Sequence, residues 1–158
     1  YTNLFETKDY VPYSVYKKLK KEYRTSGIKK YIPATHGARH LVNELIKLNY
    51  KIVLLTARPI DEFPELAQYT HYWLKKNRIK FHHLIYGGKH KHLKVLQDFP
   101  HVKFIIEDNS YVANLLAKWG YKVFLLKNEY NNDGLLKNVI KINELNEVLK
   151  HVTSRKFC

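Results

Sequence analysis

The sequence is poor in cysteine and lacks a long apolar run. Its single cysteine is the last residue, Cys158, which excludes an intrachain disulfide and fits a reducing compartment such as the cytoplasm. No apolar run approaches the roughly 20 residues that cross a bilayer, and residues 1–30 lack the apolar segment of a signal peptide. With 45% hydrophobic residues, we therefore expect a soluble, intracellular globular protein without a membrane partner.

Acidic residues are also scarce. The chain has 14 Asp and Glu against 28 Lys and Arg, a formal net charge of +14. Such a surplus attracts polyanions or phosphorylated molecules, although a solvated lysine-rich surface explains it equally well. The charge therefore bears on the choice of partner and not on the fold. The oligomeric state is left open.

Strand-like and helix-like segments alternate from residue 35 onward. Short apolar runs without polar alternation are typical of strands covered on both faces, and the segments between them repeat apolar residues at helical spacing. This order predicts an α/β fold with a Rossmann-like parallel sheet and helices on both of its faces. The expected strands are 51–56, 83–86, 103–107, 122–126 and 139–142, with helices in 36–50, 63–77, 91–99, 110–119 and 143–152.

Residues 1–34 do not show this alternation of strand-like and helix-like segments. The stretch 10–23 is a basic, tyrosine-rich helical pattern, followed by a turn at Ser26-Gly27. The length of 158 residues suits one domain with a small appendage. We therefore expect a helical segment over 1–34 beside a core over 35–158, with Thr35 as an N-cap of the first core helix.

The first candidate site residues follow the strand over 51–56. A hydroxyl and backbone N–H groups at a strand end can hold a phosphoryl oxygen, and an arginine adds a planar cationic fork. Thr56, Ala57 and Arg58 stand in these positions. Taken alone, a threonine that ends a strand and a solvated arginine explain them as well.

Two adjacent carboxylates, Glu107 and Asp108, end the strand over 103–107. In a parallel sheet, ligands bind outside the carboxyl ends of the strands, where Thr56 also falls. Capping offers another explanation, because Asp108, Asn109 or Ser110 could each accept a hydrogen bond from the next helix.

Lysines gather at the start of the helix over 91–99. Lys89, Lys91 and Lys94 are the candidates, and a cation at a helix N-terminus opposes the helix dipole, so helix stability does not explain them. An ammonium there could neutralise a phosphate together with the carboxylates. We favour Lys91, with Lys89 as a further substrate contact.

These elements together resemble the haloacid dehalogenase superfamily. The segments "KIVLLTARP", "GGKHKHLK", "VKFIIEDNS" and "YKVFLL" match its second to fourth motifs in order over about residues 35–130. The residues within these segments are similar to those of its nucleotidase and polynucleotide-phosphatase branches, which are often found in phages. The resemblance implies Mg²⁺-dependent phosphomonoester hydrolysis through an aspartyl-phosphate, on a phosphorylated small molecule such as a nucleotide or on a nucleic-acid end.

The resemblance also implies roles. Thr56 would grip the phosphoryl group and Lys91 would steady its charge, while Asp108, with Glu107 beside it, would bind Mg²⁺. The family's first motif, a strand ending in Asp-x-Asp that carries the nucleophile, has no counterpart in this sequence. Because the chain begins with Tyr1, we expect this central strand upstream, with residues 1–34 as a partial cap insert. The rival explanation is a relative that has lost catalysis, so enzymatic activity depends on that strand.

Three other functions fit less of the sequence. A phosphoacceptor signalling domain places its acidic residues before the threonine, whereas here they follow it. A non-enzymatic basic module, structural or binding nucleic acid, is compatible with the charge and the 13 tyrosines. The histidines, as in "FHHL" and "KHKH", match no common metal-ligand spacing and are expected at the surface.

Overall fold

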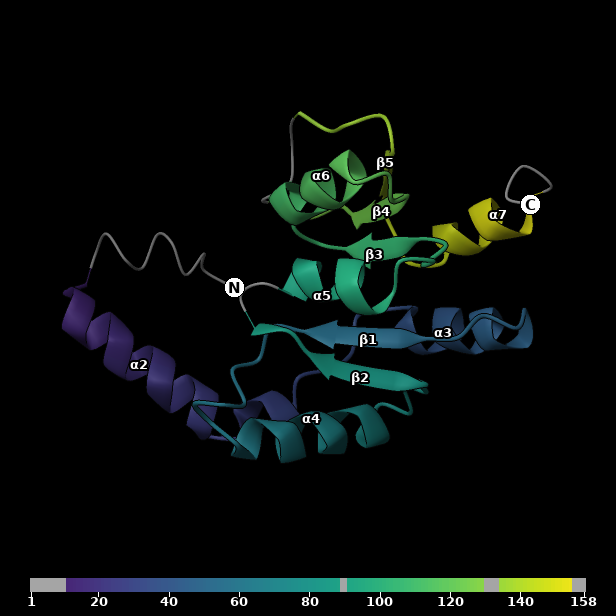
Figure 1. Ribbon diagram of the computed structural model, residues 1–158. Helices are drawn as coiled ribbons and strands as arrows, with labels where there is room; N and C mark the ends of the chain where they lie inside the picture. The colour runs from purple at the N-terminus through teal and green to yellow at the C-terminus, as the bar shows by residue number, and fades with distance from the viewer. Residues whose placement is uncertain (1–10, 89–90, 130–133, 155–158) are drawn as a thin grey trace. The chain divides into compact units, whose positions relative to one another are not determined.

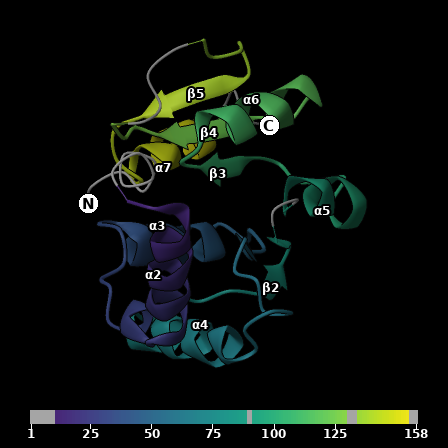
Figure 2. The ribbon, with the colours of Figure 1, turned by 90° about the vertical axis from the view of Figure 1, so that its left-hand side faces the viewer.

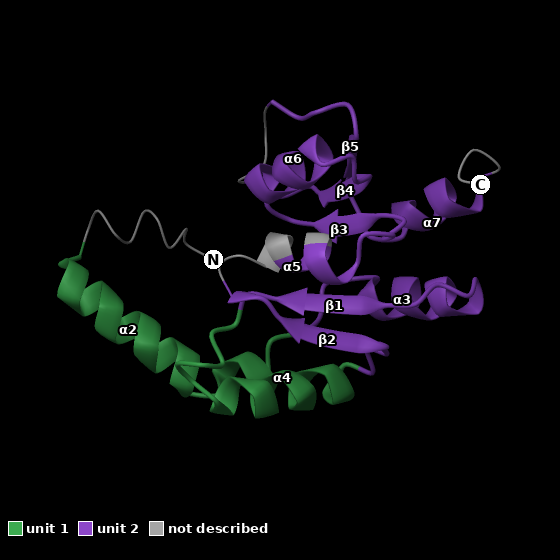
Figure 3. Ribbon diagram, in the orientation of Figure 1, with its two compact units in different colours: residues 1–33, 58–77 green, residues 34–57, 78–158 purple. Residues whose placement is uncertain are grey.

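The computed structural model describes residues 11–88, 91–129 and 134–154 (Figure 1). The chain divides into two compact units, one formed by residues 1–33 with 58–77 and the other by 34–57 with 78–158 (Figure 3). The first division lies next to the predicted boundary after residue 34. Residues 58–77, which the sequence placed in the core, cluster with the N-terminal segment. Across the described residues, no helix has the length and apolarity needed to cross a membrane.

Unit 2 has the predicted α/β architecture, with parallel strands between helices, as in Rossmann-like folds. Among its described residues, five strands form two parallel sheets, in the orders β1-β2 and β3-β4-β5. The carboxyl-terminal bounds of all five strands agree with the prediction. The strands are β1 (Val53–Thr56), β2 (His83–Tyr86), β3 (Ile105–Glu107), β4 (Val123–Leu126) and β5 (Val139–Ile142), and the helices are α3 (Ala38–Lys47), α5 (Lys91–Asp98), α6 (Ser110–Lys118) and α7 (Glu147–Thr153).

The three-stranded sheet is covered on both faces, as its continuous apolar sequence predicts. Successive side chains of a strand point to opposite faces, so Val123 and Leu125 pack with α6 in one cluster and Phe124 packs with α3 and α7 in the other. Figure 2 shows α6 and α7 on opposite sides of the strands. All three side chains are fully buried. Burial of this kind contributes about 1.5–3 kcal/mol for each large side chain, so β4 is the centre of the core.

The two sheets of unit 2 share this core without sharing hydrogen bonds. Leu55 of β1 packs against the first cluster and Ile52, just before β1, packs against the second. In the part of the chain that the structure describes, however, no ladder joins β1 to β3. The central strand expected from the resemblance stays a prediction.

Local signals set the helix ends, with one correction. Gly120, with φ of 87°, follows the C-cap Trp119 of α6, and the N–H of Tyr121 donates to the carbonyl of Leu116. The predicted N-cap Thr35 is wrong. The N-cap of α3 is Gly37, whose φ of 79° is a left-handed conformation that favours glycine over threonine.

Unit 1 is held together around α4. It contains α2 (Tyr13–Thr25), a short 3₁₀ helix η1 (Ile28–Lys30) and α4 (Glu65–Lys76). The indole Nε1–H of Trp73 on α4 donates to the carbonyl of Ile32 at 2.6 Å, and the Tyr69 hydroxyl reaches the carbonyl of Thr25 at 3.4 Å. These links between α4 and the N-terminal segment explain why 58–77 belongs to this unit.

Candidate active site at the carboxyl ends of the strands

Thr56 occupies the predicted position at the end of β1. It pairs with Tyr86 across the two-stranded sheet, and its carbonyl accepts a hydrogen bond from the N–H of Gly87 at 2.9 Å. The residue is half-buried, and Ala57 after it is exposed. The backbone at this strand end is therefore fixed by β2, which holds the threonine in place.

Glu107 and Asp108 end β3 in different environments. Glu107 is buried, and its Oε1 accepts hydrogen bonds from the backbone N–H groups of Asp108 and Asn109, both at 3.2 Å. Asp108 is exposed. Since a buried carboxylate needs hydrogen-bond donors, Glu107 serves the turn that presents Asp108.

The residue at the N-cap of α6 is Asn109 and not Asp108. The Oδ1 of Asn109 accepts from the N–H of Val112 at 3.0 Å. Of the three capping candidates, the structure therefore selects Asn109. Asp108, the residue before this N-cap, is exposed.

A residue that the sequence reasoning missed holds the same turn. The side-chain amide of Asn128, just after β4, donates to the carbonyl of Asp108 at 2.7 Å. Glu107 and Asn128 thus fix the Asp108 backbone from two neighbouring strands. The available signal was position, because Asn128 follows the carboxyl end of a parallel strand just as Thr56 and Glu107 do.

The strand directions bring these positions to one side of unit 2. β3 and β4 are parallel by their register, and the arrows of β1 and β3 point the same way in Figure 1. Thr56 and Asp108 therefore stand at strand ends on the same side of this unit. The roles predicted for them, a phosphate contact and a metal ligand, stay predictions.

The structure does not test the substrate roles predicted for Arg58 and the candidate lysines. The Nη1 of Arg58 donates to the buried Thr70 Oγ1 at 2.6 Å, a contact within unit 1. Lys89 lies outside the described residues, and Lys91 is the first residue of α5 but its side chain is not described. Lys94 is exposed. The substrate roles predicted for Arg58 and for these lysines therefore stay predictions.

The donor chemistry at Asp108 suits Mg²⁺ in one respect. Mg²⁺ commonly takes only one or two protein carboxylates and completes its shell with water and phosphate oxygens. Asp108 can provide one such carboxylate, whereas Oε1 of Glu107 is engaged by the turn. Within the described residues, no group of three or more His, Cys, Asp or Glu side chains could hold a metal ion. The described donors thus fit Mg²⁺ bound in part by its substrate.

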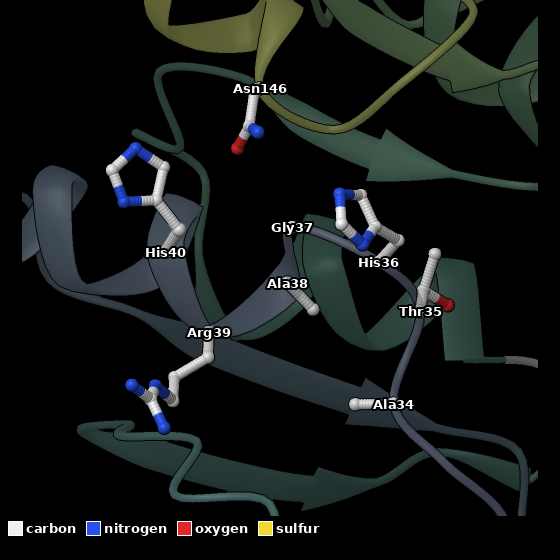
Figure 4. Close-up of a pocket in the computed structure, with 8 residues that line it drawn as sticks. All are labelled: Ala34, Thr35, His36, Gly37, Ala38, Arg39, His40 and Asn146. Carbon is white, nitrogen blue, oxygen red and sulfur yellow. The ribbon is translucent and has the colours of Figure 1, made fainter.

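A separate cavity lies at the start of α3. It has a volume of about 370 Å³ and is lined by residues 34–40 and Asn146, with His36, His40 and Asn146 around Gly37 in Figure 4. A Cβ added at Gly37 would lie 3.1 Å from Asn146 Oδ1, so a side chain there would displace Asn146. Of the predicted site residues whose side chains are described, none lines this cavity.

Comparison with known proteins gives one match that bears on function. The chain is 25% identical over 129 residues to a protein of Bacillus subtilis (strain 168) named "Putative nucleotidase YqfW". The match covers 81% of this chain and 63% of that protein, so the chain spans less than two thirds of the relative's length. No family model matches the chain. No solved structure matches it either.

Proposed function

We propose that the protein is a Mg²⁺-dependent phosphomonoester hydrolase of the nucleotidase type. The observation that carries this proposal is the placement of Thr56 and Asp108 at strand ends on the same side of unit 2. The similarity to a protein named as a nucleotidase agrees with it. The N-cap of the helix that follows β3 is Asn109.

Each described residue has a defined task in this proposal. The Thr56 hydroxyl and the backbone N–H groups after it bind oxygens of the phosphate. Asp108 would hold Mg²⁺, which would supply positive charge to neutralise the transferring phosphoryl group. Glu107 and Asn128 are positioning residues, because they hold the Asp108 backbone through the hydrogen bonds described above.

In this proposal, the nucleophile is a carboxylate on a further strand of the sheet. Its place between β1 and β3 is supported by the separation of these strands into two sheets that share one core. The carboxylate would displace the alcohol from phosphorus, and water would then release inorganic phosphate. The motif lysine, for which Lys91 is our choice, would balance the charge.

The test uses the protein isolated from its native source, with its intact mass and N-terminal sequence determined first. Phosphate release from nucleoside monophosphates and 5′-phosphorylated oligonucleotides is then measured with Mg²⁺ and with a chelator. We expect Asp108→Asn to lower turnover about 100-fold or more. Asp61→Asn, a matched change at an exposed aspartate of unit 1, should leave turnover unchanged.

Two results would overturn the proposal. One is activity that survives the chelator or the Asp108→Asn substitution. The other is a native protein of 18.9 kDa, the mass of this chain, that binds phosphorylated ligands without hydrolysing them. The second result would favour a catalytically inactive binding module.

A further inference from the structure

Unit 1 carries an unusual density of cations beside exposed aromatic rings. Between residues 11 and 33 the sequence has seven basic residues and one acidic residue, Glu22. Helix α2 has no buried residue at all. A helix that buries no face gains little stability from the core of its own unit. Packing therefore does not explain why α2 is rich in lysine and tyrosine. The seven basic residues are Lys17, Lys18, Lys20, Lys21, Arg24, Lys29 and Lys30.

Lysines lie over tyrosine rings at both ends of this region. On α2, the ammonium of Lys17 is 4.7 Å from the ring centroid of Tyr13. Near η1, the ammonium of Lys30 is 4.6 Å from the ring of Tyr69, and that of Lys76 is 4.8 Å from the ring of Tyr31. Each contact orders a cation next to a flat aromatic surface.

Two of these rings, those of Tyr13 and Tyr31, remain open to solvent, as does the ring of Tyr72. Tyr13 is 62% exposed, Tyr31 is 61% exposed and Tyr72 is 48% exposed. Tyr13 stacks on Tyr16 with ring centroids 6.4 Å apart and planes inclined by only 17°, while Tyr31 and Tyr72 meet edge to face at 6.3 Å. Exposed aromatic surface combined with ordered cations is the chemistry that proteins use to stack bases and to neutralise phosphates.

The cations also repel one another. Burial, followed by the charges of Arg58, Arg24 and Lys20, lowers the pKa of Lys29. Lys29 lies 4.9 Å from the ring of Tyr23, so its ammonium is held within the same cluster. A polyanion bound here would relieve this repulsion, because its phosphates bring the opposite charge to the group.

We propose that the tyrosine–lysine surface of unit 1, defined by Tyr13, Tyr31, Tyr72, Lys17, Lys30 and Lys76, binds single-stranded nucleic acid. The exposed rings stack on bases and the lysines contact the phosphates. A single strand is favoured over a duplex because only unpaired bases offer their faces to the tyrosines. This binding goes beyond the proposed hydrolysis and does not depend on it.

The test measures binding of a fluorescein-labelled 20-nucleotide oligo(dT) to the 158-residue chain by anisotropy, without Mg²⁺. Tyr13→Ala, Tyr31→Ala and Tyr72→Ala should each weaken binding roughly fivefold or more, since stacking on an aromatic side chain is lost. Tyr111→Ala is the matched control: this tyrosine lies on α6 of unit 2 and is 73% exposed. It should leave the affinity unchanged.

The salt dependence of binding distinguishes the contribution of the lysines from that of the tyrosines. Replacing Lys17 or Lys30 with glutamine should reduce the slope of log affinity against log salt by about 0.7 for each phosphate contact removed. The tyrosine variants should lower the affinity without changing that slope. All variants are compared by circular dichroism, and because the substituted tyrosines are exposed, we expect native helix content in each.

Three outcomes would overturn the proposal. They are equal affinity of the tyrosine variants and the unaltered chain, duplex binding as tight as oligo(dT) binding, and binding to phosphatidylserine vesicles without binding to the oligonucleotide. The last would assign the surface to a membrane. Because the assay reads binding without turnover, none of these results bears on the proposed phosphatase.

Discussion

The two units are built on different principles. In unit 2, aliphatic and aromatic side chains fill both faces of a three-stranded sheet, and the buried residues come from strands and helices alike. Among the described residues of unit 1, the buried apolar ones are Phe63, Leu66 and Leu74, all from 58–77, and α2 contributes none. Hydrophobic burial therefore stabilises unit 2 strongly, whereas unit 1 depends more on individual polar links.

Each unit carries one of the two tryptophans of the chain, so the unfolding of each unit can be followed separately by fluorescence. Trp73 lies in α4 of unit 1, and Trp119 is the C-cap of α6 in unit 2. With Trp119→Phe in the background, fluorescence reports on unit 1. With Trp73→Phe in the background, it reports on unit 2. The second background removes the bond from Trp73 to Ile32, so it is used only for unit 2.

The largest effect is expected from Phe124→Ala in the centre of β4. The side chain is fully buried and packs edge to face on Phe104 at 5.5 Å. Truncation leaves a cavity, so the free energy of unfolding should fall by about 3–5 kcal/mol. Urea denaturation followed by Trp119 fluorescence measures it. Tyr13→Ala on α2, an aromatic side chain that is exposed, should change stability by no more than about 0.5 kcal/mol.

A loss of similar size in both variants would contradict the contrast between the units. It would mean that α2 buries its aromatic face in the native protein.

A smaller effect, confined to unit 1, is expected from Thr70→Val. Thr70 Oγ1 accepts from Arg58 and donates to the carbonyl of Leu66, both at 2.6 Å. The change keeps the shape of a buried side chain but removes both bonds, one of them to a charged group. We expect a loss of about 1.5–3 kcal/mol in the unfolding of unit 1, read from Trp73. Thr153→Val, which removes a single bond from an exposed hydroxyl at the end of α7, is the control and should matter little.

The sequence predicted the strands better than the long-range contacts. The patterns placed β2 and β5 at their observed bounds and marked the carboxyl ends of β1 and β3 through Thr56 and Glu107. These features are local, because an apolar run ends where a polar residue begins. The expected starts of β1 and β3 were two residues early, since a strand begins where its ladder begins and that depends on the partner strand.

Contacts between distant residues could not be read from local patterns. The bond from Trp73 to Ile32 spans 41 positions and groups α4 with the N-terminal segment, and the periodicity of α4 carries no sign of it. The same holds for the candidate site. The sequence places two carboxylates at the end of β3. Only the structure shows that the Glu107 side chain accepts hydrogen bonds from the backbone of the following turn, while Asp108 is exposed.

The third prediction concerns the cap that presents Asp108. Asn109→Ala removes the acceptor for the N–H of Val112 and should cost unit 2 about 1 kcal/mol. Asn109→Asp keeps a capping oxygen and should stay close to the unaltered protein. Urea denaturation followed at Trp119, at the opposite end of the same helix, measures both. Equal losses for Ala and Asp would show that the amide nitrogen, and not the cap, is what matters.

The smallest effect tests the charge difference between the units. In unit 2, hydrogen bonds from the N–H groups of Asn143 and Glu144 lower the pKa of Glu147. Folding therefore favours the charged carboxylate. Its contribution to stability is lost only as the pH falls through the lowered pKa. In unit 1, burial and nearby cations lower the pKa of Lys29. Its charged form is therefore disfavoured by folding, and the cost is present at neutral pH and is relieved as the pH rises through the lowered pKa.

Lys29→Met should therefore raise the thermal transition of unit 1 slightly at pH 7, because it keeps the apolar stem and removes the repelled charge. The gain should shrink between about 0.01 M and 1 M salt, where the screening length falls from roughly 30 to 3 Å. Lys118→Met at the exposed end of α6, where a cation favours the helix dipole, should bring no gain. A lower transition for Lys29→Met would instead show that the contact of Lys29 with the Tyr23 ring outweighs the repulsion from Arg58, Arg24 and Lys20.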